Sequence, residues 1–161
     1  MSRATKAKLA FIPSGLRGEK SLFASRCCRL KRSALHSCDT LCMFSAVLLD
    51  HFEHPRNAGE LSSANTKIET SNPVCGDVLQ LSALIENKTI REVRFLCRGC
   101  TASIACASLL TEFIRGRELH ELSSITSEAL AASLGGLPPA SFHAAQLAHD
   151  ALESLLRAAP Q

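Results

Sequence analysis

A chain of 161 residues with 46% hydrophobic and 20% charged residues is typical of one globular domain that has its own core. No apolar run approaches the roughly 18 residues needed to span a bilayer, so no membrane association is expected. The net charge of +3 combines a balance of +7 over residues 1–42 with −4 over residues 43–161, and the chain has neither Trp nor Tyr, so no nucleic-acid partner is expected.

Residues 1–42 form a basic, Ser-rich leader without a sustained helical or strand period. They are interpreted as a disordered extension, as a transit peptide, or as a misread start upstream of Met43. The last interpretation is favoured, because the pattern becomes domain-like immediately after Met43. A cytoplasmic location is expected, or the mitochondrial matrix if the leader is a transit peptide.

The predicted elements of residues 43–158 describe a single domain. Apolar spacing predicts a short helix from Phe44 to Phe52, followed by strands at 66–72, 77–86 and 90–98. The last two strands are joined by a three-residue turn over 87–89, which indicates an antiparallel hairpin. A helix beginning near Thr101, short helical segments at 118–122 and 127–134, and a long helix from Ala140 follow. This order predicts an α+β fold, a small three-stranded antiparallel sheet packed by helices on one face.

Cys75 and Asp77 are separated by one glycine just before a predicted strand. Alternate residues of a strand point to the same side, so the thiol and the carboxylate can contact the same bound group. Both are metal ligands when deprotonated. The alternative interpretation of this segment is a simple strand entry.

Cys100 lies between the end of a strand and the start of a helix. Free N–H groups and the helix dipole stabilise a thiolate there, which predicts a reactive or ligating thiol rather than a merely buried one. Cys97 shares the strand phase of Val93 and Phe95 and is expected to face the core. Cys106 is expected to be a core thiol.

His143 is predicted in the first turn of the last helix. With Cys75, Asp77 and Cys100 it makes a Cys₂-Asp-His set, which can close a tetrahedral zinc site or hold iron in a cluster. A second histidine pair, His51 and His54, lies at the end of the first helix, and solvated polar positions are the favoured interpretation there.

Several motifs together resemble the IscU/NifU-type iron–sulfur cluster assembly scaffolds. In chain order they are residues 49–57 (Leu-Asp-His-Phe-Glu-His-Pro-Arg-Asn), Cys75-Gly76-Asp77, residues 99–105 (Gly-Cys-Thr-Ala-Ser-Ile-Ala), residues 111–116 (Thr-Glu-Phe-Ile-Arg-Gly) and Leu137-Pro138-Pro139. The resemblance covers Met43 to about Leu156. It implies a SufE/NifU-like scaffold fold and metal ligation by Cys75, Asp77, Cys100 and His143.

The resemblance also implies a function without catalytic turnover. A cysteine desulfurase would deliver sulfur to Cys75 or Cys100, iron would enter, and a [2Fe–2S] cluster would pass to iron–sulfur acceptor proteins. One alternative is a zinc-binding persulfide acceptor. The other is a degenerate scaffold that only binds and regulates the desulfurase.

Two motifs depart from the family pattern. The third cysteine of the family follows the histidine directly, and here that position is Ala144. Fewer thiolates predict a more loosely held cluster, because iron–sulfur centres favour thiolate ligands. The Leu-Pro-Pro motif continues with Ala140-Ser141 in place of the family's Val-Lys, which argues against handling by an Hsp70-type chaperone.

Overall fold

The computed structural model describes residues 43–160, and the expectations for the leader lie outside this range. Helix α1 (Ala46–Glu53) precedes strands β1 (Thr66–Ser71), β2 (Val78–Glu86) and β3 (Thr89–Arg98). Helices α2 (Thr101–Ile114), α3 (Leu119–Leu122) and α4 (Ser127–Ser133), the 3₁₀ turn η4 (Pro139–Ser141) and α5 (Phe142–Ala158) follow. Among the described helices, none has the length and apolar character to cross a membrane.

The three strands form an antiparallel sheet in the order β1-β2-β3. Asn87 and Lys88 join β2 to β3 with φ angles of 51° and 59°. Two successive positive φ values define the tight hairpin turn that follows the twist of the strands. The predicted three-residue turn is therefore one residue too long, because Thr89 already pairs with Glu86.

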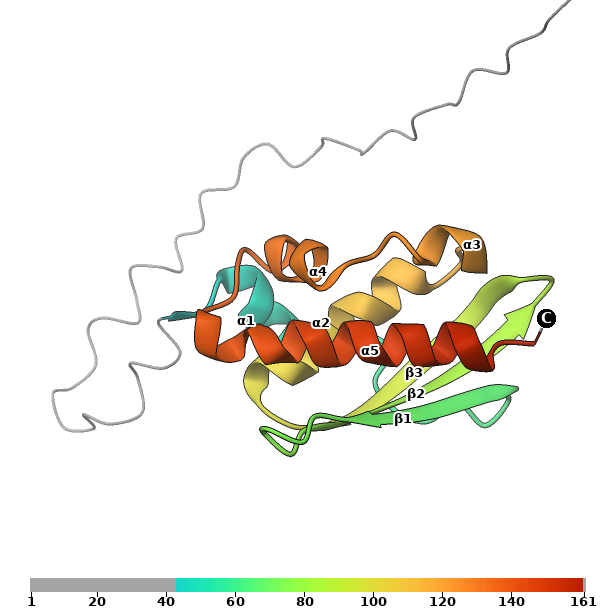
Figure 1. Ribbon diagram of the computed structural model, residues 1–161, viewed down its shortest axis with the longest axis horizontal. Helices are drawn as coiled ribbons and strands as arrows, with labels where there is room; N and C mark the ends of the chain where they lie inside the picture. Colours follow the sequence, from blue (N-terminus) through green and yellow to red (C-terminus); the bar gives the residue numbers. More distant parts are fainter. Residues whose placement is uncertain (1–42, 161) are drawn as a thin grey trace, which may run out of the picture. The chain divides into compact units, whose positions relative to one another are not determined.

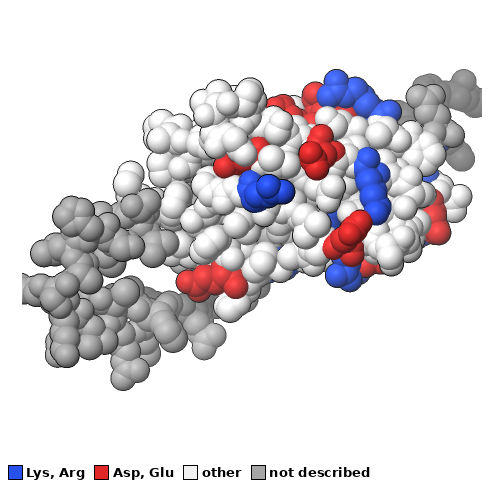
Figure 2. Space-filling model, turned by 90° about the horizontal axis from the view of Figure 1, so that it is seen from below, with Lys and Arg blue, Asp and Glu red and all other residues white. Residues whose placement is uncertain are grey.

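The helices cover one face of the sheet (Figure 1). α5 packs on β1 and β2, while α2 packs on β3. Alternate residues of β2 face these helices and are buried, namely Leu79, Leu81, Ala83 and Ile85. Viewed from below, the surface carries interspersed acidic and basic side chains (Figure 2). The predicted α+β architecture is confirmed.

The segment after α1 is hydrogen-bonded to both β3 and α2. The Phe95 carbonyl accepts from the Gly59 N–H at 2.8 Å, and the Phe95 N–H donates to the Asn57 carbonyl at 3.0 Å. His51 is buried, and its Nδ1 lies 3.0 Å from the Ser108 hydroxyl of α2. The expectation of a solvated His51 is therefore wrong. Its imidazole helps to fix α1 on α2.

Candidate metal centre

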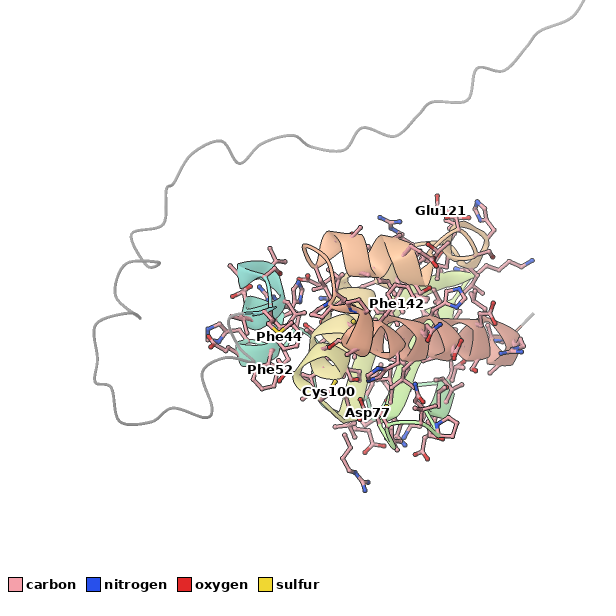
Figure 3. All side chains as sticks on the ribbon, turned by 60° about the vertical axis from the view of Figure 1, so that its left-hand side comes forward. Phe44, Phe52, Asp77, Cys100, Glu121 and Phe142 are labelled. Carbon is pink, nitrogen blue, oxygen red and sulfur yellow. The ribbon has the colours of Figure 1, made fainter. Side chains whose placement is uncertain are left out.

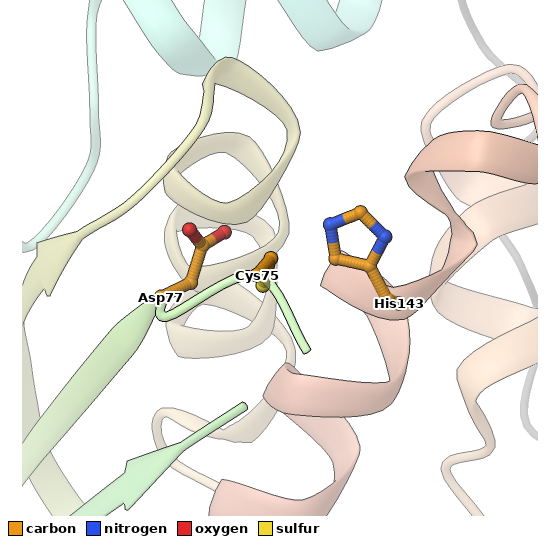
Figure 4. Close-up of side chains that lie close together, drawn as sticks. All are labelled: Cys75, Asp77 and His143. Atoms are coloured by element: carbon orange, nitrogen blue, oxygen red, sulfur yellow. The ribbon is translucent and has the colours of Figure 1, made fainter. Parts of the chain in front are cut away.

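Three predicted ligands come together from separate parts of the chain. The ligand atoms of Cys75, Asp77 and His143 all lie within 4.8 Å of one another. Cys75 comes from the loop before β2, Asp77 from the residue next to β2, and His143 from the first turn of α5. Figure 4 shows these side chains gathered where the loop approaches the helix.

The loop that carries Cys75 is closed by its own backbone. Asn72 donates its N–H to the Asp77 carbonyl at 2.9 Å, and its own carbonyl accepts from Gly76 at 2.8 Å. The Asn72 side chain also accepts from the Val74 N–H at 2.8 Å. Gly76 has a φ of +73°, which a side-chain-bearing residue rarely adopts. This tight loop leaves Cys75 exposed.

Asp77 connects the loop to the N-terminus of α2. The side chain is buried, and its Oδ2 accepts a hydrogen bond from the Cys100 N–H at 3.3 Å and another from the Ser103 hydroxyl. Burial raises the pKa of Asp77, but the hydrogen bonds from Ser103 and Cys100 outweigh it and hold the pKa below its ordinary value. The carboxylate is therefore ionised at neutral pH and suited to a cation.

Cys100 is the N-cap residue of α2, as the sequence predicts, and it is exposed. Its sulfur lies 3.3 Å from the Ser103 hydroxyl. Figure 3 shows Cys100 and Asp77 close together at this end of the helix. Cys100 does not belong to the set of three ligands within 4.8 Å. It is linked to that set by the hydrogen bond from its N–H to the Asp77 carboxylate.

His143 is partly exposed in the first turn of α5, whereas the next residue, Ala144, is buried. Ala144 is 1% exposed and is part of the hydrophobic core. The histidine therefore points out toward the Cys75 loop, whereas the next residue packs inward. The position where the resemblance expects a third thiol is a tightly packed one in this chain.

The other two cysteines of the described region are core thiols. Burial raises the pKa of Cys97 and of Cys106 to about 12 in each case. Cys106 is fully buried, and the half-buried Cys97 packs against the core, as its strand phase predicts. Neither thiol ionises readily near neutral pH, so neither matches Cys75 or Cys100 as a ligand.

The donor set fits a tetrahedral metal ion. Zinc bound by sulfur, nitrogen and oxygen at about 2.0–2.3 Å needs ligand atoms roughly 3.3–3.8 Å apart. The three ligand atoms already lie within 4.8 Å of one another, so closing around an ion requires shifts of about 1 Å. Cys100, at the adjoining N-terminus of α2, would be the fourth donor, although it lies outside the set of three within 4.8 Å. The same two thiols, carboxylate and imidazole can hold iron.

Ser103 and Gly99 also contact Asp77 and were not among the predicted site residues. Ser103 lies three residues after Cys100 on α2, and residues at this spacing share a helix face. The spacing alone could therefore have predicted that Ser103 lies beside Cys100. Gly99 lies so close to Asp77 that a Cβ atom there would come within 2.7 Å of the Asp77 Cγ. The importance of Gly99 depends on this long-range approach and is not visible in the sequence.

The structure is that of a small α+β protein in which a thiol, a carboxylate and an imidazole lie close together, with a second exposed thiol beside them. The family model for the NifU-like N terminal domain matches residues 43–158. The chain therefore belongs to the family of NifU-like N-terminal domains.

Curated relatives are more than one third identical to this chain over the aligned residues. An iron–sulfur cluster assembly scaffold protein, IscU 1 of Archaeoglobus fulgidus, is 39% identical over 110 residues, which are 68% of this chain and 72% of that protein. The IscU scaffold protein of Haemophilus influenzae is 36% identical over 117 residues, covering 70% of this chain and 92% of its own length. The IscU scaffold protein of Azotobacter vinelandii is 36% identical over 118 residues, which are 71% of this chain and 91% of that protein.

Solved structures share the fold. A putative iron–sulfur cluster assembly scaffold for the SUF system from Fervidobacterium islandicum matches with a TM-score of 0.60 at 21% identity, over 71% of this chain and 97% of that one. A protein described as hypothetical matches with a TM-score of 0.59 at 27% identity, over 70% of this chain and 95% of that one. The expected scaffold-type fold is confirmed.

Proposed function

We propose that this protein is a scaffold on which iron–sulfur clusters are assembled and from which they pass to acceptor proteins. The observation that carries the proposal is the convergence of Cys75, Asp77 and His143 within 4.8 Å, with Cys100 adjoining them. The IscU relatives, whose names describe scaffolds for this assembly, support it. The protein itself needs no catalytic turnover for this role.

Sulfur arrives at an exposed thiol. The Cys75 thiolate attacks the outer sulfur of a persulfide on a cysteine desulfurase, a new S–S bond forms, and the S–S bond of the donor breaks to release its cysteine thiolate. Val74, beside Cys75, is 90% exposed. The Cys75 loop is therefore open to a partner that delivers sulfur. Cys100 is the second exposed acceptor.

Iron and sulfide, the cargo of the scaffold, are held by the four predicted ligands. Cys75 and Cys100 contribute thiolates, Asp77 an ionised carboxylate, and His143 an imidazole. A [2Fe–2S] cluster has four terminal ligand positions, which this number of donors satisfies. With two thiolates rather than more, the cluster is held loosely enough to be passed on.

A zinc-binding persulfide acceptor is the second candidate. The mixed donor set of Cys75, Asp77 and His143 favours it, because one sulfur, one oxygen and one nitrogen are all common zinc ligands. Zinc would then occupy the site until Cys75 or Cys100 accepts sulfur.

Anaerobic reconstitution with a desulfurase, cysteine and ferrous iron tests the proposal. The wild-type protein is expected to develop the visible absorption of a cluster, whereas Cys75→Ala, Cys100→Ala and Asp77→Ala lose it. Cys106→Ser removes a buried thiol outside the site and serves as the control that keeps the cluster. A wild-type protein that stays colourless, or a cluster unaffected by the ligand substitutions, contradicts the proposed function.

A further inference from the structure

A buried hydroxyl connects two of the predicted ligands. Ser103 is 2% exposed, and its Oγ lies 3.3 Å from the Cys100 sulfur while also bonding to the Asp77 Oδ2. It lies on α2, the helix that Cys100 begins. One side chain thus contacts a thiol and a carboxylate that are 23 residues apart in the chain.

The direction of these hydrogen bonds follows from the groups involved. An ionised carboxylate only accepts, so the single hydroxyl proton of Ser103 points to Asp77. The Ser103 oxygen is then free to accept from the Cys100 S–H. When Cys100 loses its proton to bind a metal, the Ser103–Asp77 bond does not need to change.

The backbone at Gly99 packs closely against the Asp77 carboxylate. A Cβ atom at Gly99 would lie 2.7 Å from Asp77 Cγ and 2.9 Å from its Oδ2. Asp77 is therefore packed against the backbone at Gly99 while it bonds to Ser103 and to the Cys100 N–H. Of these contacts, only the Ser103 hydroxyl comes from a side chain that can be removed without altering a predicted ligand.

We propose that Ser103 is a positioning residue of the metal centre, whose hydroxyl fixes the Asp77 carboxylate next to Cys100 in the orientation that metal binding uses. The inference rests on the proposed function, because it takes Asp77 and Cys100 as ligands. Groups that orient ligands typically change metal affinity 10–100-fold when they are removed. Ser103 touches the ligands and not the metal, so its loss weakens the site without removing a donor.

Anaerobic titration with cobalt(II) tests this role, read from the thiolate charge-transfer and d–d absorption bands. The full chain is used in a background where Cys27, Cys28, Cys38 and Cys42 are serine, so that the leader adds no thiol ligands. Ser103→Ala is expected to weaken cobalt binding by about 10-fold or more. Ser108→Ala is the matched control, since Ser108 is a fully buried serine of the same helix that bonds to His51 instead. It is expected to retain wild-type affinity.

Ser103→Thr keeps the hydroxyl and is expected to retain most of the affinity, and thermal unfolding of each variant reports its stability separately. If Ser103→Ala binds cobalt as tightly as Ser108→Ala, or if Ser103→Thr loses as much affinity as Ser103→Ala, the inference is overturned. A wild-type protein that builds clusters while Ser103→Ala keeps full cobalt affinity refutes only the positioning role. Cobalt binding that depends on Ser103 in a protein that builds no cluster refutes only the proposed function.

Discussion

Ala144 occupies the position at which the resemblance to cluster scaffolds leads us to expect a third cysteine. It follows the predicted ligand His143 and is buried in the core. Ala144→Cys adds a thiol next to the site and is expected to slow loss of the cluster to a chelator by about 10-fold, because iron–sulfur centres favour thiolate ligands. The decay of visible absorption after adding the chelator measures this.

Ala145→Cys provides the matched control, since Ala145 is also buried and comes next on α5. It carries the same overpacking cost, typically about 1–3 kcal/mol, without the predicted proximity to the ligands. Equal cluster lifetimes in the two variants would show that position 144 does not reach the site.

The four cysteines of the described domain differ in their expected reactivity. Cys75 and Cys100 are exposed, whereas burial raises the pKa of Cys97 and Cys106 to about 12. Iodoacetamide at about pH 8 is therefore expected to alkylate the exposed pair and to leave the buried pair largely unmodified, because the thiolate is the reactive form. Peptide-resolved mass spectrometry of the native protein distinguishes the four sites.

Unfolding in denaturant before alkylation is the control, and all four thiols are then expected to react. Modification of Cys97 at the rate of Cys75 in the native protein would contradict its placement against the core.

At the scale of elements, α1 and α2 are joined by a polar network around His51. Its Nδ1 faces the Ser108 hydroxyl, which accepts from the Arg56 N–H at 2.9 Å, and its Nε2 lies 3.7 Å from Glu112. The Glu112 carboxylate can only accept, which favours the neutral tautomer with its proton on Nε2, and Nδ1 then accepts from the Ser108 hydroxyl. Asp50 forms an ion pair with Arg56 next to this network.

This network predicts a dependence of stability on pH. Burial lowers the pKa of His51 below its ordinary 6.5, and the positive charge of Arg56 adds to this, outweighing Glu112 and Asp50. Above pH 6.5 the contribution of the neutral ring to stability is complete, and it is lost as the pH falls from that value through the lower pKa of the folded state. The free energy of unfolding should therefore decrease between about pH 7.5 and 5.5.

His51→Asn removes the titrating group and keeps an acceptor for Ser108, so a smaller decrease in unfolding free energy over the same pH range is expected. Chemical denaturation at several pH values measures both proteins. His54→Asn is the comparison, because His54 is exposed. A pH dependence of the His51 variant identical to that of the wild type would contradict this role.

The elements were predictable from the sequence because local patterns determine them. The strand predicted at 77–86 and the long helix predicted from Ala140 match β2 and α5 to within two residues at their starts, and the N-cap position of Cys100 followed from the strand-to-helix break. His51 was misassigned because its burial depends on Ser108, 57 residues away, which no local pattern reveals. The turn at Asn87 was placed one residue too long because its length depends on the pairing of Glu86 with Thr89.

The site was predictable in its members but not in its arrangement. Residue type and family motifs pointed to Cys75, Asp77, Cys100 and His143, and the structure brings the first, second and fourth of these within 4.8 Å. That Asp77 joins the Cys75 loop to α2 through Ser103 depends on contacts between distant segments. Their role as ligands remains a prediction until metal is measured on the variants.

At the scale of the whole molecule, the helices and the sheet leave the site at one end of the domain. The loop before β2, the start of α2 and the start of α5 meet there, and two of the four predicted ligands are exposed thiols. Such an arrangement suits a cargo that enters and leaves through protein partners rather than a permanently enclosed metal.

The iron, zinc and acid-labile sulfide contents of the anaerobically purified protein test the scaffold proposal most directly. We expect iron and sulfide in nearly equal amounts, both lost when Cys75 and Cys100 are replaced by alanine. Stoichiometric zinc with no sulfide, unchanged after reconstitution with a desulfurase and iron, would contradict it and favour the zinc-binding persulfide acceptor.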